Sequence, residues 1–283
     1  MRRAPPRHAV RLAYTVALAL PLACKAPAST RPDAAPQPLS APASASAPAS
    51  ASASAPAPAF RPIGPYELPF DGPRTVFYVV PRATLGPHRL MANLHGVCNP
   101  PGYACGYWVQ AASEVGFLVC PSGNAHCGGP SGPPTWTEPV AAIDADLEKA
   151  IAVVDAKHPN ELTREGAVLT GFSLGAYSAV QIARNHPGRW PYLIVNEADV
   201  PLDAAQLRAA GVKAVALIAG ENGSQVGGER RTADKLTKQG FPARLWVMKG
   251  AGHHYSADID TIMAEALAFV LAEGISPDGG AAR

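Results

Sequence analysis

The sequence contains little charge: 16% of its 283 residues are charged, and the formal net charge at pH 7 is +2. Six basic residues and one Asp fall within residues 1–60, which leaves 18 basic and 21 acidic residues, a net charge of −3, for the rest of the chain. A weakly acidic domain lacks the basic surface that attracts a nucleic-acid backbone. The composition therefore argues against nucleic-acid binding.

Long hydrophobic runs are scarce as well. One apolar run, from about Leu12 to Ala23, follows several arginines and precedes small residues. It is too short to span a bilayer comfortably, so residues 1–24 are predicted to be a secretory signal peptide. The end of the run, "LPLAC", resembles the lipobox of bacterial lipoproteins, which implies lipidation at Cys24, although Pro21 stands where that motif prefers Leu. An ordinary signal peptide with an incidental Cys is the alternative.

Large apolar side chains are almost absent from residues 25–62, which consist mostly of Ala, Pro and Ser. Such a segment cannot bury enough apolar surface to offset the entropy of ordering, so we expect a flexible tether. Residues 63–276 are predicted to form one folded domain, and residues 277–283 a flexible tail. Behind a lipidated cysteine, the tether would let the domain reach away from a membrane.

Cysteine is used sparingly, and the four cysteines of the predicted domain fall into two pairs of equal spacing, Cys98 with Cys105 and Cys120 with Cys127. An even number of cysteines in an exported chain indicates disulfides. We predict that the disulfides join the two local pairs. We also predict that the protein is exported to the bacterial cell envelope or secreted. A zinc site that includes His126 is the competing interpretation, but the spacings are longer than those of common zinc motifs.

Apolar, β-branched runs alternate with helical patterns after residue 60. This alternation predicts an α/β fold with a mostly parallel central sheet and helices on both faces. In such sheets ligands bind beyond the carboxyl ends of the strands. The predicted strands are 75–80, 89–95, 115–120, 166–172, 192–197, 212–219 and 243–249, the helices are 139–158, 174–186, 229–239 and 256–273, and the loops at the carboxyl ends begin at His95, Cys120, Ser173, Glu197, Gly220 and Gly250.

The segment "GFSLG", Gly171 to Gly175, places a serine between a predicted strand and a predicted helix. This context distinguishes a nucleophile elbow from a chance G-x-S-x-G match. A sharp turn would hold Ser173 in a strained conformation, and a side chain at either glycine would collide with the neighbouring strand or helix. We predict that Ser173 is a nucleophile; the alternative is a helix-capping serine in a glycine-rich turn.

A serine hydroxyl needs a base within hydrogen-bond reach before it can attack. The loop after the last predicted strand reads "GAGHHYS", and its small residues would let it turn back over the sheet. We predict that His253 is the base, with His254 as the rival or as a residue that lines the pocket.

The motifs "NLHGVC", "GFSLG" and "GAGH", in this order, resemble those of α/β-hydrolases, in particular secreted esterases, feruloyl esterases and polyhydroxyalkanoate depolymerases. The resemblance covers about residues 70–273 and implies the α/β-hydrolase fold. It also implies an oxyanion hole formed by the backbone N–H groups of Val97 and Leu174. His95 is expected to brace this loop rather than to react.

Besides the serine and the histidine, the catalytic triad of this family includes an acidic residue. At this residue the sequence departs from the family pattern. The family usually has Asp in a G-x-x-D turn after the penultimate strand, but here the turn reads "AGENGSQVGG", with Gly223 in that place. We predict Glu221 as the acid. Asp199 is the rival, and Asn222 would be a weaker substitute that orients the histidine. The acid holds the imidazole in the correct tautomer and stabilises its cation.

Aromatic side chains gather in the loops after His95 and Cys120. We predict that they line a shallow substrate pocket suited to an aromatic or polymeric ester, although packing under the loops would also explain them. The predicted pocket residues are Tyr103, Tyr107, Trp108, Trp136 and His254.

The residues together predict a serine hydrolase that cleaves a carboxylic ester. A peptidase or acyltransferase with the same residues is one alternative, and a non-catalytic surface lipoprotein that binds carbohydrate or polymer is another. We expect no metal and no cofactor. The expected partners are a small-molecule or polymeric ester and, only through Cys24, a membrane; the protein is expected to be a monomer.

Overall fold

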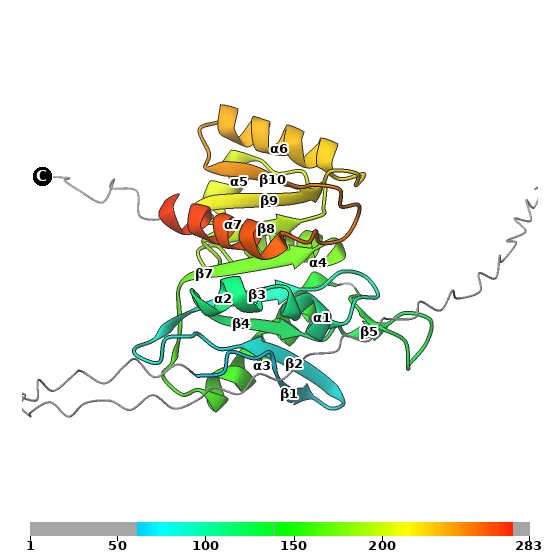
Figure 1. Ribbon diagram of the computed structural model, residues 1–283, viewed down its shortest axis with the longest axis vertical. Coiled ribbons are helices and arrows are strands. Elements are labelled where there is room, and N and C mark those ends of the chain that lie inside the picture. Colours follow the sequence, from blue (N-terminus) through cyan, green and yellow to red (C-terminus); the bar gives the residue numbers. More distant parts are fainter. Residues whose placement is uncertain (1–60, 138, 274–283) are drawn as a thin grey trace, which may run out of the picture. The chain divides into compact units, whose positions relative to one another are not determined.

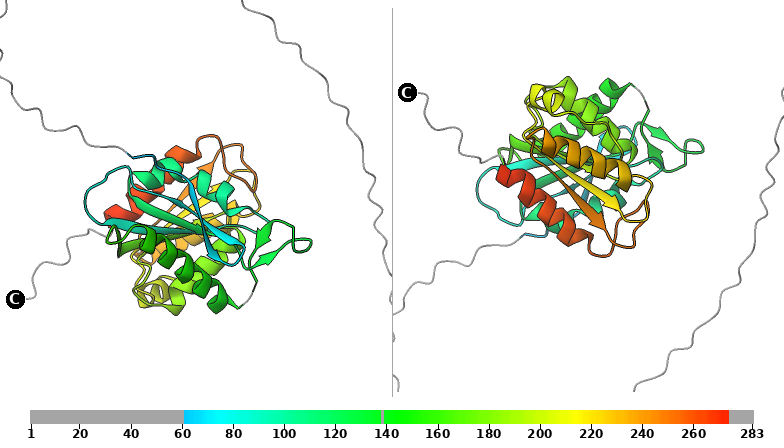
Figure 2. Two further views of the ribbon diagram at one scale, coloured as in Figure 1. Left: turned by 90° about the horizontal axis from the view of Figure 1, so that it is seen from below. Right: turned by 90° about the horizontal axis from the view of Figure 1, so that it is seen from above.

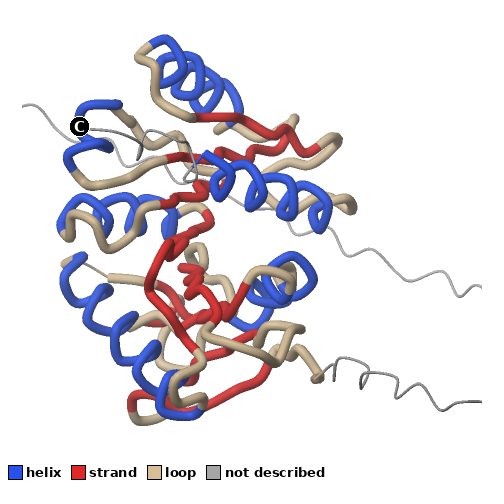
Figure 3. Tube along the Cα trace, turned by 90° about the vertical axis from the view of Figure 1, so that its left-hand side faces the viewer, coloured by secondary structure: helices blue, strands red, loops and turns tan. Residues whose placement is uncertain are grey.

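The computed structural model describes residues 61–137 and 139–273. These residues form a sheet covered by helices on both faces (Figure 1), and the edge-on view in Figure 3 shows the strands between two helical layers. The predicted signal peptide, Cys24, nearly all of the tether and the tail lie outside the described residues. Among the described helices, none is long and apolar enough to cross a bilayer.

The sheet has eight strands in the order β1-β2-β4-β3-β7-β8-β9-β10. β1 pairs with β2, and β2 with β4, in antiparallel fashion, whereas all other neighbours are parallel. The strands are β1 (Tyr66–Asp71), β2 (Arg74–Val79), β3 (His88–Leu94), β4 (Gly116–Pro121), β7 (Leu162–Phe172), β8 (Tyr192–Asn196), β9 (Ala214–Gly220) and β10 (Ala243–Met248).

A small separate hairpin, formed by β5 (Ala125–His126) and β6 (Pro134–Thr135), projects from one end of the domain in Figure 2. The helices are α1 (Pro101–Gly106), α2 (Val109–Ser113), α3 (Val140–Lys157), α4 (Leu174–Asn185), α5 (Ala204–Ala209), α6 (Val226–Lys238) and α7 (Ile259–Glu273).

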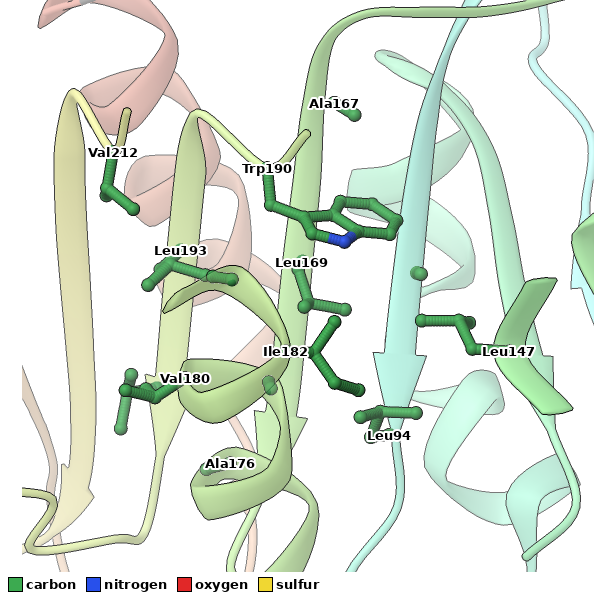
Figure 4. Packing of buried hydrophobic residues seen from close by; sticks show 14 of the residues in the cluster. Leu94, Leu147, Ala167, Leu169, Ala176, Val180, Ile182, Trp190, Leu193 and Val212 are labelled. Atoms are coloured by element: carbon green, nitrogen blue, oxygen red, sulfur yellow. The ribbon is translucent and has the colours of Figure 1, made fainter. Parts of the chain in front are cut away.

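Two buried apolar clusters lie on the two faces of the sheet. Neighbouring residues of one strand, such as Val168 and Leu169, belong to opposite clusters because successive side chains of a strand point to opposite faces. One cluster includes residues of α3 to α6, and Figure 4 shows Trp190, Leu169 and Ile182 within it. The other includes residues of α1, α2 and α7. Burial of each large side chain stabilises the fold by about 1.5–3 kcal/mol.

The predicted fold is confirmed, and every predicted strand and helix is present with its ends shifted by a few residues. The face of α3 that carries Ile143, Leu147, Ile151 and Val154 is buried as its spacing required. Edge strand β1, the three short helices and the hairpin were not predicted. The helices have at most six residues, too few to show a helical period, and β1 contains no buried residue.

The four cysteines form two disulfides, as expected, but the predicted local pairing is wrong. The bonds join Cys98 to Cys127 and Cys105 to Cys120. Cys105 lies on α1 and Cys120 on β4, two elements that pack together in the core, whereas Cys98 and Cys127 join the loop after β3 to the hairpin. With all four sulfurs in disulfides, the alternative zinc site does not form.

His95 braces the loop after β3 and the segments that flank the β5–β6 hairpin, as expected of a structural residue. Its Nδ1–H donates to the carbonyl of Gly96 at 2.8 Å, and its Nε2 accepts the N–H of Gly123 at 3.0 Å. The ring stacks on Trp136, whose indole N–H donates to the His95 carbonyl at 2.8 Å. Both ring nitrogens are thus used by the neutral imidazole, and burial lowers the pKa of His95 to about 4.

We predict that both disulfides stabilise the fold and that they differ in how easily they are reduced. The chain-entropy model gives about 3 kcal/mol for the 15-residue separation of Cys105–Cys120 and about 3.5 kcal/mol for the 29-residue separation of Cys98–Cys127. Paired Cys→Ala substitutions should lower the free energy of unfolding by amounts of this order in urea titrations. Because Cys105 and Cys120 are buried and Cys98 is exposed, mild reductant should open Cys98–Cys127 first. A non-reducing peptide map with Cys98–Cys105 and Cys120–Cys127 cross-links would contradict the assignment.

We also predict an acid-sensitive contribution from His95. Its folded pKa lies below the ordinary value of 6.5, so the unfolded chain takes up a proton first as the pH falls. The contribution of neutral His95 to the free energy of unfolding should be fully present above about pH 6.5. It should decrease by roughly 3 kcal/mol as the pH approaches 4. His95→Gln removes the titration while keeping an acceptor for Gly123, so its unfolding free energy should depend less on pH. The exposed His126→Gln is the matched control; equal pH dependence in wild type and His95→Gln would refute the prediction.

Candidate active site

Ser173 lies at the turn between β7 and α4. Its backbone has φ 52° and ψ −120°, a conformation that non-glycine residues rarely adopt. The Ser173 N–H donates to the carbonyl of Asn196 at 2.8 Å, which ties this turn to the end of β8. The expected strain is therefore confirmed, and the hydroxyl lies at the N-terminus of α4, where the helix dipole favours negative charge.

The glycines of "GFSLG" are required by close packing. A Cβ at Gly171 would lie 2.4 Å from the carbonyl of Gly175, and a Cβ at Gly175 would lie 2.0 Å from the carbonyl oxygen of Leu94. Both distances are far below van der Waals contact. The collisions expected from the sequence are confirmed, and they explain how α4 begins directly against the carboxyl end of β3.

His253 lies beside the serine, in the loop between β10 and α7. Its Nε2 is 3.0 Å from Ser173 Oγ, and its Nδ1 is 3.0 Å from Oε2 of Glu197. The carboxylate accepts the Nδ1–H, so Nε2 is left to accept the serine hydroxyl proton. The ring packs against Phe172, with 5.1 Å between centroids. The structure thus brings together the two residues predicted as nucleophile and base, and adds a third.

Glu197 directly follows β8, and its side chain is 0% exposed. Its backbone has φ 53°, and its own N–H donates to the carbonyl of Ile218 at 2.8 Å. Oε1 accepts the N–H of Gly220, so both carboxylate oxygens are occupied. Burial raises the pKa of Glu197, an effect opposed by the hydrogen bond from Gly220 and by His253.

The predicted acids lie elsewhere, so the structure contradicts their proposed contact with His253. Glu221 is exposed and accepts the N–H of Gly250 at 2.9 Å, which braces the histidine loop without touching the imidazole. Asp199 faces α6 and lies 3.7 Å from Arg231. The weaker candidate, Asn222, uses its N–H to hold the same loop.

The sequence places Glu197 at the end of a predicted strand, where a loop at the carboxyl end of the sheet begins, but a contact with the histidine cannot be read from that position. A Cβ at Gly220 would lie 2.9 Å from Glu197 Oε1, and one at Gly223 would lie 3.1 Å from Oε2. The glycine that occupies the expected position of the acid therefore leaves room for a carboxylate that arrives from the neighbouring strand.

The loop after β3 approaches the serine from the other side. A Cβ at Gly96 would lie 3.0 Å from Phe172 Cδ1 and 3.4 Å from the Ser173 Cβ, so glycine permits this approach. Val97 follows, with its side chain 54% exposed, and its N–H makes no backbone hydrogen bond with the described residues. Leu174, as the first residue of α4, has an N–H without an intrahelical acceptor.

A cavity of about 480 Å³ opens beside Ser173. Of the predicted pocket residues, Tyr103 lines it and is 59% exposed. Tyr107 lies behind Tyr103, with the two hydroxyl oxygens 2.5 Å apart, and this contact raises the pKa of Tyr107 to about 12. The cavity is lined by Gly96, Val97, Cys98, Asn99, Pro100, Tyr103, Phe172, Ser173 and His253.

Like Tyr107, the other three predicted pocket residues do not line this cavity. Trp108 is 1% exposed and belongs to the core beside α7, and Trp136 is 5% exposed and stacks on His95. His254 turns back onto its own loop, where Nδ1–H donates to the Tyr255 carbonyl and Nε2 accepts the Gly252 N–H. The two tryptophans are large apolar side chains, and burying them stabilises the fold more than exposing them to solvent in a pocket would.

The described residues contain no group of three or more His, Cys, Asp and Glu side chains arranged to hold a metal ion.

Neither a protein-family model nor a curated protein matches this chain. Several solved structures, in contrast, match this chain. An S-formylglutathione hydrolase from Agrobacterium tumefaciens aligns with a TM-score of 0.53 and 17% identity, over 71% of this chain and 90% of that one. A ferulic acid esterase aligns with a TM-score of 0.53 and 14% identity, over 76% and 99%. The carboxylesterase of Bacillus cereus aligns with a TM-score of 0.51 and 13% identity, over 70% and 96%. With the sheet order and the serine turn, this likeness shows that the chain has the α/β-hydrolase fold.

Proposed function

We propose that this protein is a serine hydrolase that cleaves carboxylic esters through an acyl-enzyme on Ser173. One observation carries the proposal: the hydrogen-bonded series from Ser173 through His253 to the buried Glu197, with 3.0 Å at each step. The named activities of the structurally similar proteins, two esterases and an S-formylglutathione hydrolase by their titles, support the same reaction class.

In the first half of the reaction, Ser173 Oγ attacks the ester carbonyl carbon while His253 Nε2 accepts the hydroxyl proton. Glu197 stabilises the resulting imidazolium through Nδ1–H. The backbone N–H groups of Val97 and Leu174 are the proposed donors to the oxyanion. The carbon–oxygen bond to the alcohol then breaks, and the alcohol leaves with the proton from His253.

In the second half, water attacks the acyl-enzyme and gives a proton to the same imidazole. The new tetrahedral centre collapses, the carboxylic acid departs, and Ser173 recovers its proton from His253. His253 thus accepts two protons in one cycle, from Ser173 and from water, and releases both, to the alcohol and to Ser173. No metal ion or redox group takes part in any step.

The open cavity and the exposed Tyr103 fit a small ester or the end of a polymer chain, which remains the proposed substrate class. The absence of a G-x-x-D acid would favour the alternative of a non-catalytic binding protein. Glu197 occupies that role in the geometry, which favours the enzyme. No contact favours a peptidase or an acyltransferase over an esterase.

Export remains part of the proposal. Two disulfides support an oxidising compartment, in agreement with a signal peptide at residues 1–24. Attachment through a lipid on Cys24 and the monomeric state stay predictions.

The nucleophile is tested by fluorophosphonate labelling and by hydrolysis of p-nitrophenyl esters. Wild type should be labelled and should turn over the ester, and Ser173→Ala should lose both. Turnover that survives in Ser173→Ala at the wild-type rate, or a wild type that neither reacts nor is labelled, would reject the proposed function.

The acid is tested by three amide substitutions. Glu197→Gln keeps the shape of the side chain but removes the charge that stabilises the imidazolium, so kcat should fall by up to about 10⁴-fold. Glu221→Gln should change kcat by less than about tenfold because it touches only the loop backbone. Asp199→Asn tests the rival acid and should also change kcat by less than about tenfold, because this carboxylate lies beside Arg231 and not beside His253. A larger loss in Glu221→Gln than in Glu197→Gln would restore the sequence-based choice.

A further inference from the structure

Glu229 is a second buried carboxyl group close to the triad, and the mechanism above does not use it. It lies on the first turn of α6, and its exposed fraction is 0%. Oε1 accepts the backbone N–H of Ala198 at 2.7 Å, whereas Oε2 is buried without a hydrogen-bond partner among the described residues. Ala198 directly follows Glu197, so this contact acts on the turn that presents the acid.

The start of α6 fits closely against this turn. Gln225 Oε1 accepts the N–H of Asp199 at 3.1 Å, so side chains one helical turn apart hold two consecutive backbone donors. A Cβ at Gly228 would lie 1.9 Å from Cγ of Asp199, which leaves no space between helix and turn. The helix therefore restrains a segment whose first residue, Glu197, has φ 53°.

The form of Glu229 that fits here is the neutral acid. No salt bridge joins it to any described Lys, Arg or His, and an ionised carboxylate with one oxygen buried and unpartnered would be costly. Burial, and to a smaller extent the negative charges of Glu197 and Asp199, raise the pKa of Glu229 to about 9.

The other titratable groups around Glu229 do not replace a counter-charge. Tyr177 lies nearby on α4; burial raises the pKa of its phenol, and the charges of Asp199 and Glu229 add to this rise. Arg231 is on the same helix but points to Asp199, and its side chain is 76% exposed. Three carboxyl groups thus surround one turn, and the one without a cation keeps its proton near neutral pH.

We propose that Glu229 is a positioning residue for the Glu197–His253 pair: its neutral carboxyl group holds the N–H of Ala198 and keeps the turn that directs Glu197 toward the imidazole. This inference rests on the proposed function. When Glu229 loses its proton in alkaline solution, two neighbouring buried carboxylates repel each other and the turn loosens. Hydrolysis should therefore decline on the alkaline side, around pH 9.

Two substitutions separate the hydrogen bond from the charge. Glu229→Gln keeps an acceptor for Ala198 but cannot ionise, so kcat at neutral pH should stay within about twofold of wild type and the alkaline decline should disappear. Glu229→Ala removes the acceptor, and kcat should fall about tenfold with little change in KM, as expected for the loss of one hydrogen bond. Glu265→Gln is the matched control; its carboxyl group bonds to Trp246 away from the site, and its pH profile should equal that of wild type.

A spectroscopic readout makes the test independent of turnover. The Nδ1 proton of His253, identified by its absence in His253→Ala, should give a downfield proton resonance in wild type and Glu229→Gln. This resonance should be lost or shifted upfield in Glu229→Ala. If the wild type shows the resonance but hydrolyses nothing, the proposed function fails while the positioning role is still decided by this comparison.

The proposal is overturned if Glu229→Ala keeps both the wild-type kcat and the His253 resonance, or if Glu229→Gln keeps the wild-type alkaline decline. If Glu229→Ala does not fold, the pH profile of Glu229→Gln against Glu265→Gln decides the question alone.

Discussion

The imidazole of His253 joins two turns that are distant in sequence, and the proposed chemistry depends on this bridge. One nitrogen is 3.0 Å from Ser173 Oγ, and the other is 3.0 Å from the carboxylate of Glu197. Glu197 is fully buried whereas the imidazole is half exposed, so the carboxylate is shielded from water while His253 and Ser173 line the cavity. An interaction of this kind is stronger than the same pair in solvent.

Backbone strain is concentrated at this end of the sheet. Among the described residues, Cys98, Ser173 and Glu197 are three of the four non-glycine positions with positive φ. Each is restrained by a different means: Cys98 by its disulfide, Ser173 by the close packing of Gly171 and Gly175, and Glu197 by β9 and α6. Strained positions persist only where the surrounding structure determines them. The closely packed sheet and helices around these three positions supply that restraint.

The sequence was sufficient to predict the fold and two of the three aligned residues. Ser173 and His253 lie next to glycine motifs at strand ends, and both features are local. Glu197 is different, because its contact with His253 depends on the pairing of β8 with β9 and on one positive φ value, neither of which is visible in the order of residues. The disulfides follow the same rule: equal local spacing favoured the wrong pairs, and the packing of α1 on β4 decides the right ones. Trp136 was mistaken for a pocket residue since an aromatic in a loop does not reveal which side it faces.

In the proposed mechanism, Ser173 carries the acyl group during hydrolysis. The most direct measurement is peptide mass spectrometry of the protein after acid quenching during turnover of p-nitrophenyl acetate. The tryptic peptide of residues 165–184 should gain one acetyl group located on Ser173, and the modification should decay once substrate is exhausted. Turnover with this peptide unmodified, or with the acetyl group on another residue, would contradict the account.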